Sequence, residues 1–330
     1  MELAVSLPIA GLPLHEVPGL VGQARAWGYT GAWATEVAGP DFASLLGAVA
    51  AGVDGIDLGV AVAPVATRSP WLLAATAASL SHLSQGRFTL GLGTSSEVIV
   101  EQWSGIPFER PLARLRETVE VVRAMLAGQK VAHEGEFVRS QGYRLFAPTP
   151  APVPIVLGAL NPRSLRQAGE IGDGVCLNQL GPEHVPQVLA AVREGAEAAG
   201  RTLPDDYPVI ARLFCWVTDE AGEAREAVRR MLAPYVATSV YNRFYRWLGF
   251  ADEAEGVLRA FAEGDRDAAV AAMSDRLIDT AAVVGDADAV AARVQAYVDA
   301  GVTTPVIACP SRDPRDAAAT LVAVGTRLAG

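Results

Sequence analysis

Lysine is almost absent from this sequence. Lys130 is the single lysine among 27 basic residues, and with 37 acidic residues the formal net charge is −10. Such an acidic chain lacks the positive surface with which proteins hold nucleic acids or anionic membranes, so we expect neither partner. Schiff-base chemistry is also disfavoured, because it would have to use Lys130, which lies in a polar segment after a helix-like stretch.

Cysteine and histidine are scarce as well. Three cysteines (Cys176, Cys215 and Cys309) stand far apart, and the four histidines show no His-x-x-x-His spacing. We therefore expect no metal site, and the reduced thiols of a cytoplasmic protein. No basic leader, no apolar run of about 20 residues and no Gly-x-Ser-x-Gly motif is present. These absences leave the chemistry to a bound organic cofactor and a small-molecule substrate.

What is abundant is apolar sequence, at 51% of the residues. Short β-type runs alternate with helical patterns, which predicts a parallel sheet with crossover helices. Strands are expected at 3–7, 30–35, 56–62, 87–92, 153–157, 175–177, 209–217 and 303–308. About eight such units favour an α/β fold of the closed (β/α)8, or TIM, barrel type, with a two-domain doubly wound protein as the alternative.

Two segments break this alternation. Residues 129–152 suggest a hairpin after the fourth helix, and residues 233–280 are helical in composition and rich in aromatic side chains. We interpret residues 1–330 as one barrel domain in which these segments are insertions, the second lying before the last helix–strand unit. Asp41 and Asp219 are each expected to cap a following helix, the second of which ends near Leu232.

Candidate site residues lie where strands end, because reacting groups gather there in a parallel barrel. After the fourth strand come Gly93, Thr94, Ser95 and Ser96, and after the fifth strand Gly158 and Ala159. Small residues and hydroxyls at a helix start can hold a phosphate, yet the same residues also make ordinary tight turns. Ser96 stands where a dinucleotide-binding fingerprint needs glycine, so that motif is absent.

The other strand ends offer fewer groups. Ala61 and Val62 end the third strand, where an apolar surface either supports a ring system or is simply buried. Glu36, beside Thr35, ends the second strand, and Glu97 follows the fourth. Each carboxylate is either a candidate acid catalyst or an ordinary surface group.

Several of these segments resemble the luciferase-like monooxygenase superfamily. The resemblance is carried by residues 84–93 (SQGRFTLGLG) and 168–174 (AGEIGDG), and also by residues 58–70, 107–117 and 154–159. Within the superfamily, the chain resembles the branch that uses the deazaflavin coenzyme F420, typified by methylenetetrahydromethanopterin reductase.

The resemblance implies a TIM barrel, a homodimer, and hydride transfer between C5 of the deazaflavin and a small organic substrate. It places a non-prolyl cis peptide at Ala61–Val62, behind the ring, and the phosphate contacts at residues 93–96, 158 and 159. Glu36 would be a proton donor or an anchor. Family members that oxidise glucose 6-phosphate carry an Asp-His pair where this chain has Glu36-Val37, so that substrate is disfavoured.

Two alternatives stay open. One is an FMN-dependent monooxygenase that uses reduced flavin and oxygen, and the other is a relative that binds flavin without catalysis. In each case Thr35, Glu97, Trp103 and Asn178, with the aromatic residues at 241–247, are candidates to shape the substrate mouth. Ordinary packing is the competing interpretation of each.

Overall fold

The computed structural model describes residues 2–329. Its parallel strands close into a ring in the order β1-β2-β3-β5-β8-β9-β10-β12, with β12 pairing back to β1. The strands are β1 (Ala4–Leu7), β2 (Gly31–Ala34), β3 (Asp57–Val60), β5 (Phe88–Gly93), β8 (Ile155–Gly158), β9 (Gly174–Asn178), β10 (Val209–Val217) and β12 (Thr304–Ala308). The predicted TIM barrel is confirmed, and the doubly wound alternative is wrong because the sheet closes.

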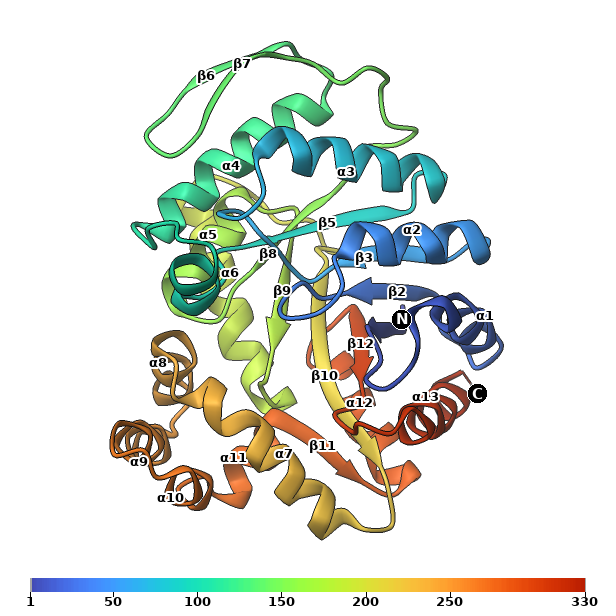
Figure 1. Cartoon of the computed structure of the whole chain (residues 1–330), viewed down its shortest axis with the longest axis vertical. Helices are drawn as coiled ribbons and strands as arrows, with labels where there is room; N and C mark the ends of the chain where they lie inside the picture. Colours follow the sequence, from blue (N-terminus) through green and yellow to red (C-terminus); the bar gives the residue numbers. More distant parts are fainter. Residues whose placement is uncertain (1, 330) are drawn as a thin grey trace.

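Helices surround this barrel (Figure 1). They are α1 (Val17–Ala26), α2 (Phe42–Gly52), α3 (Pro70–Leu83), α4 (Pro111–Leu126), α5 (Pro162–Ile171), α6 (Val185–Ala198), α7 (Ala221–Val236), α12 (Ala287–Asp299) and α13 (Pro314–Leu328). Short helical turns are η1 (Leu14–Glu16), η2 (Val98–Trp103, a π-helix) and η3 (Pro182–His184).

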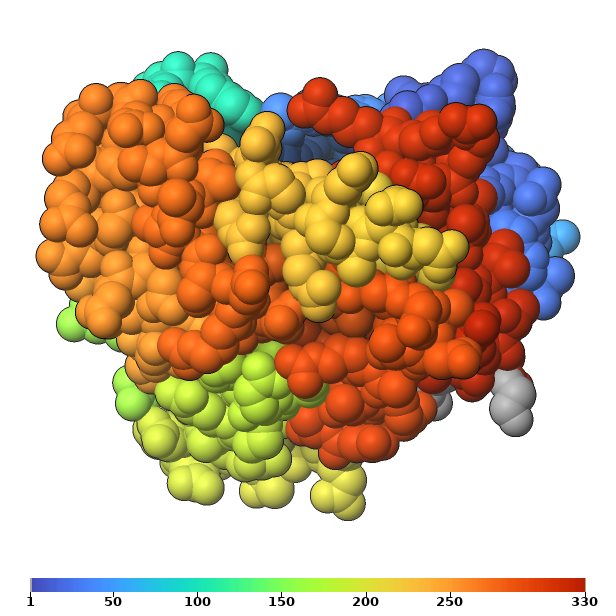
Figure 2. Space-filling view, turned by 90° about the horizontal axis from the view of Figure 1, so that it is seen from below, coloured from blue at the N-terminus to red at the C-terminus, as the bar shows by residue number. Residues whose placement is uncertain are grey.

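The segments expected as insertions hold their own elements. Residues 129–152 contain the antiparallel hairpin of β6 (Val131–Glu134) and β7 (Arg139–Tyr143). Residues 233–280 contain α8 (Ser239–Trp247), α9 (Ala251–Ala262), α10 (Arg266–Ala271) and most of α11 (Asp275–Ala281). Figure 2 shows the α8–α10 segment as a lobe on one side of the molecule. The grouping of the chain into one domain stays a prediction.

The two predicted helix caps, Asp41 and Asp219, had different outcomes. Asp41 caps α2 as expected, since its carboxylate accepts hydrogen bonds from the amides of Ala43 and Ser44, both at 3.0 Å. The cap at Asp219 is wrong: Glu220 occupies the N-cap position without a side-chain hydrogen bond, and α7 continues to Val236.

Two strands were not predicted from the sequence. They are β11 (Ala282–Gly285), which pairs with the C-terminal half of β10, and the short β4 (Ala63–Pro64).

The barrel interior is filled by side chains from alternate positions of its strands. An inner cluster consists of Ala4, Trp33, Val156, Cys176, Ile210 and Val306. The Trp33 ring is accommodated by Gly59 on β3, where an added Cβ would lie 2.4 Å from the ring. This layer is solid, so a ligand can only bind above it, at the carboxyl ends of the strands.

The family-like segment 168–174 has a structural role. An added Cβ at Gly169 would lie 1.8 Å from the Val192 carbonyl oxygen, so α5 and α6 approach at backbone distance. Arg201 donates to the carbonyls of Gly169 and Gly172 at 2.8 and 3.1 Å. Asp173 accepts from the Ile155 amide at 2.9 Å, which fixes α5 to the start of β8.

The β6–β7 hairpin is tied to α4 by one carboxylate. Glu117 accepts hydrogen bonds from the amides of Glu136, Phe137 and Val138 at 3.1, 2.8 and 2.9 Å. Arg114 places its guanidinium 5.1 Å from the centre of the Phe137 ring. The hairpin therefore lies against α4 on the outer side of the barrel, as Figure 1 shows.

The contact between α5 and α6 predicts a large effect of Gly169→Ala. The extra methyl group overlaps the Val192 carbonyl, so we expect the free energy of unfolding to fall by about 2–3 kcal/mol in urea titrations. Gly47→Ala in α2 is the control, because a Cβ there meets no atom within 4 Å. That variant should be unchanged or slightly stabilised. Equal effects of the two substitutions would contradict the packing argument.

The Glu117 contact predicts a pH-dependent contribution to stability. Partial burial raises the pKa of Glu117, but the three amide hydrogen bonds outweigh this and lower it below 4.5. Stability from Glu117 is therefore fully present above its unfolded pKa and is lost as the pH falls through the lower folded pKa. Glu117→Gln should cost about 1 kcal/mol at pH 7.

This cost should shrink in strongly acidic buffer, measured as the difference in unfolding free energy between variant and wild type. Glu120→Gln on the same helix, at an exposed position, is the matched control and should cost little at any pH. A Glu117→Gln deficit that stays constant with pH would refute the charge-dependent contact.

Candidate active site

The floor of the barrel mouth is built around Val62. The peptide between Ala61 and Val62, directly after β3, is cis, as the resemblance implied. An added Cβ at Gly93 would lie 2.4 Å from a Val62 methyl, and one at Gly158 would lie 3.1 Å from both methyls. Glycine on β5 and β8 therefore leaves the space that the Val62 side chain fills.

These residues form a ring platform, by which we mean Ala61 and Val62 with Gly91, Gly93 and Gly158. Ala61 and Val62 pack on the inner cluster and are only partly buried, so they cover the barrel interior and still face outward. No side chain rises from the three glycines, which leaves an apolar surface suited to a planar ring. The Val62 position thus fits a flavin-like cofactor.

The turn at residues 94–96 follows β5 and precedes η2. Ser95 has a left-handed backbone, with φ of 63°. The Ser96 hydroxyl accepts from the Ile99 amide at 3.5 Å, and the Thr94 hydroxyl lies 3.4 Å from the Ser95 carbonyl. Within residues 2–329, the backbone amides of Thr94, Ser95 and Ser96 donate no hydrogen bond to the protein. Free amides and hydroxyls beside one another suit an anion such as a phosphate.

The second predicted phosphate turn is different. The Ala159 amide already donates to the Cys176 carbonyl at 3.1 Å, and the Ser164 hydroxyl accepts from the amides of Leu160 and Asn161 at 3.2 and 3.1 Å. Gly158 contributes by its missing side chain beside Val62. A phosphate contact at Ala159 stays a prediction, and the donors available to an anion are those of the 94–96 turn.

Glu36 is held by Arg68. The Arg68 Nε donates to the two carboxylate oxygens at 2.8 and 3.1 Å, and an Nη donates to Oε1 as well. Both side chains are largely buried, at 16% and 15% exposure, and the Arg68 guanidinium stacks 4.8 Å from the Phe42 ring centre. The hydrogen bond to Glu36 raises the pKa of Arg68. A carboxylate paired in this way acts more readily as an anchor than as a proton donor.

The expected substrate residues are spread around the mouth. Thr35 already donates its hydroxyl to the Leu7 carbonyl at 3.3 Å, while Glu97 and Trp103 are exposed at the start and end of η2. Asn178, the last residue of β9, donates from Nδ2 to the Tyr241 hydroxyl at 3.0 Å. Its Oδ1 is buried without a hydrogen-bond partner. Of these residues, Asn178 is the one with an unused polar group inside the barrel.

Sequence reasoning missed Arg212. It lies on β10 beside Asn178, and its Nε donates to the Ser6 hydroxyl at 3.0 Å while its guanidinium stacks 4.5 Å from the Phe214 ring centre. Burial lowers its pKa, yet an arginine side chain stays protonated in proteins. The available signal was an arginine two residues after Ile210 within an apolar strand, a spacing that directs both side chains to the same face.

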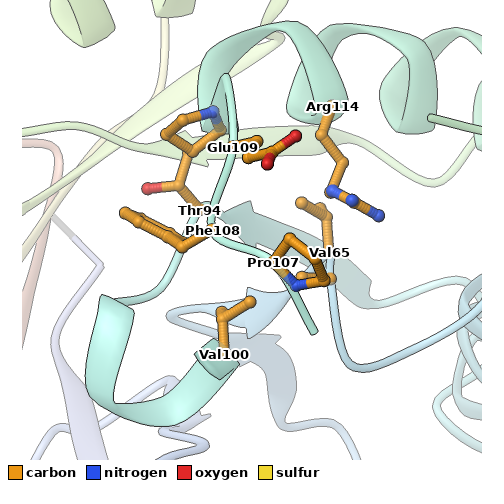
Figure 3. Close-up of a pocket in the computed structure, with 9 residues that line it drawn as sticks. Val65, Thr94, Val100, Pro107, Phe108, Glu109 and Arg114 are labelled. Carbon is orange, nitrogen blue, oxygen red and sulfur yellow. The ribbon is translucent and has the colours of Figure 1, made fainter. Parts of the chain in front are cut away.

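A small cavity lies behind the 94–96 turn (Figure 3). It has a volume of about 10 Å³ and is lined by Val65, Ala66, Thr94, Val100, Pro107, Phe108, Glu109, Pro111 and Arg114. This space holds about one water molecule, so it is a packing gap and not a ligand site. The Glu101 carboxylate accepts from the Phe108 amide at 2.8 Å and holds this segment in place.

No group of three or more His, Cys, Asp or Glu side chains in the part of the chain that the structure describes could hold a metal ion. No helix between residues 2 and 329 is both long and apolar enough to span a bilayer.

This chain is similar in sequence and in architecture to proteins that are already known. Residues 1–304 match the family model described as luciferase-like monooxygenase. A Mycobacterium tuberculosis protein, provisionally named as a coenzyme F420-dependent oxidoreductase, is 30% identical over 97% of this chain and 98% of its own. The 5,10-methylenetetrahydromethanopterin reductase of Methanolobus tindarius is 30% identical over 94% and 95% of the two chains.

Among solved structures, the coenzyme F420-dependent tetrahydromethanopterin reductase of Methanopyrus kandleri superposes with a TM-score of 0.82. That alignment covers 99% of both chains at 25% identity. Barrel closure, the cis peptide at Ala61–Val62 and these similarities over nearly the whole length agree with one another. The chain belongs to the luciferase-like monooxygenase family.

Proposed function

We propose that this protein is a coenzyme F420-dependent oxidoreductase that transfers a hydride between the deazaflavin ring and a small organic substrate. The observation that carries the proposal is the ring platform, where Val62 fills the space left by Gly93 and Gly158. The names of the relatives from M. tuberculosis and M. kandleri, both F420-dependent, support this cofactor over FMN. The homodimer and the cytoplasmic location stay predictions.

Each part of the site has a task in this function. The bound cofactor supplies hydride chemistry at C5 of its ring. Val62 and Ala61 support one face of the ring and keep water from it. The free amides of the 94–96 turn would donate hydrogen bonds to a phosphate of the cofactor, so that no lysine is needed there.

Loop positions around the ring are set by ion pairing. The Glu36–Arg68 pair joins the segment after β2 to the segment before α3. Glu36 follows the end of β2, and Arg68 stands two positions before Pro70, the first residue of α3. This pair fixes the edge of the mouth, which favours the anchor role predicted for Glu36. The substrate would then lie on the open face of the ring, opposite Val62.

Cofactor titration tests the proposal. We expect the wild-type protein to quench the fluorescence of added F420 with saturable binding and to bind FMN far more weakly. Gly93→Ala should weaken F420 binding at least about tenfold, or 1.4 kcal/mol, because its methyl group displaces Val62 from the platform. Gly222→Ala on α7, where a Cβ meets no atom within 4 Å, is the control and should bind normally.

Two results would contradict the proposal. Tight FMN binding with no measurable F420 affinity, followed by oxygen-dependent turnover, would favour the monooxygenase alternative. Tight retention of F420 with no change in its redox state on any panel of alcohols, aldehydes, imines and enoic acids would favour a non-catalytic binding protein.

A further inference from the structure

Arg212 is a partly buried cation on the inner face of β10 whose charge no described acidic residue neutralises. Among residues 2–329 it forms no ion pair with Asp or Glu, and its one hydrogen bond runs from Nε to the neutral Ser6 hydroxyl. Both terminal nitrogens lack a hydrogen bond to the described residues, and neither is sealed from solvent. A partly buried guanidinium with both terminal nitrogens free can bind an anion through two parallel hydrogen bonds.

A second unused group lies next to it. Arg212 and Asn178 are register partners on neighbouring parallel strands, so their side chains project from the same face of the sheet. Asn178 uses Nδ2 for the Tyr241 hydroxyl, and its Oδ1 has no partner although it is buried. Two donor nitrogens of Arg212 and one amide oxygen of Asn178 are therefore left without a described protein partner on neighbouring strands.

These groups face the same space as the ring platform. Ile210, two residues before Arg212 on β10, belongs to the inner cluster on which Ala61 and Val62 also pack. Arg212 projects into the barrel directly above this layer. The mouth thus has an apolar side, made by β3, β5 and β8, and a polar side, made by Ser6, Asn178 and Arg212.

The local charge favours a singly charged ligand. The electrostatic neighbours of Tyr241, which borders the same space, are Tyr235 and one cation, Arg212. A phosphate dianion would usually meet several cations or amides, as at the 94–96 turn, whereas one guanidinium fork matches the two oxygens of a carboxylate. The neighbouring Asn178 oxygen can accept a hydrogen bond from a hydroxyl or amino group on the same molecule.

We propose that Arg212 binds the carboxylate of the substrate, so that the protein acts on small carboxylic acids that carry a hydroxyl or amino group within reach of Asn178. This inference rests on the proposed function for the identity of the reaction. The carboxylate site itself does not depend on the proposed function, because carboxylate binding can be measured without cofactor.

Ligand binding to the full-length protein tests the site directly. Lactate, propionate and benzoate are titrated at constant ionic strength against their neutral amides, with calorimetry and the thermal unfolding midpoint as readouts. We expect the acids to bind and to raise the midpoint, and the amides to do neither. Lactate should bind more tightly than propionate, because its hydroxyl can donate to Asn178.

Substitutions then assign the site to these residues. Arg212→Gln should weaken carboxylate binding at least tenfold, and Arg212→Lys should weaken it less, since it keeps the charge but loses the bidentate fork. Asn178→Asp should abolish binding while the protein remains folded, because the new carboxylate occupies Arg212. Arg243→Gln, at an exposed position on α8, changes the net charge equally and should leave binding unchanged.

The outcomes separate this inference from the proposed function. Wild-type protein that binds none of the acids, or Arg212→Gln that binds them as tightly as wild type, would overturn it. Loss of F420 binding in Arg212→Gln with carboxylate binding intact would also overturn it, since the anion at Arg212 would then be the cofactor. Carboxylate binding that needs Arg212 in a protein without F420 affinity would support the site and refute only the proposed cofactor.

Discussion

The arrangement of the barrel mouth depends on one packing contact, the insertion of the Val62 side chain into the space left by Gly93 and Gly158. Any larger residue at either glycine would push Val62 out of its position between β5 and β8. The same contact lets the chain after β3 cover the inner cluster, so the barrel interior below Val62 is filled by side chains. The position of each candidate cofactor contact therefore depends on this floor.

Much of the fold could be predicted from sequence because strand and helix patterns are local. Alternation of short apolar runs with longer helical segments located the strands of the closed ring, and Asp41 marked its helix through a cap that involves only nearby residues. Asp219 failed for the opposite reason. Its position looked like a cap, but the long β10 pairs with β11 through Val217, and α7 starts beyond that pairing.

The site was predictable only in part. Resemblance indicated the cis peptide at Ala61–Val62, which the structure contains, and the 94–96 turn, whose phosphate contact stays a prediction. The hydrogen-bond partners of the site residues come from distant segments and leave no local signal in the sequence. Arg68 and Glu36 are 32 positions apart, and Arg212 and Ser6 are 206 positions apart. Spacing could not show that the Ala159 amide already donates to the Cys176 carbonyl, or that Arg212 pairs with no acidic residue between positions 2 and 329.

The lobe of α8–α11 lies outside the hydrogen-bonded ring that closes the barrel. It still reaches the site, because Tyr241 contacts Asn178, and the Tyr245 hydroxyl donates to Gln179 at 3.1 Å. Part of the mouth is therefore built by a stretch of sequence that takes no part in closing the barrel. Substitutions in α8 can therefore change the surroundings of Asn178 and Gln179 while the strands that close the ring stay as they are.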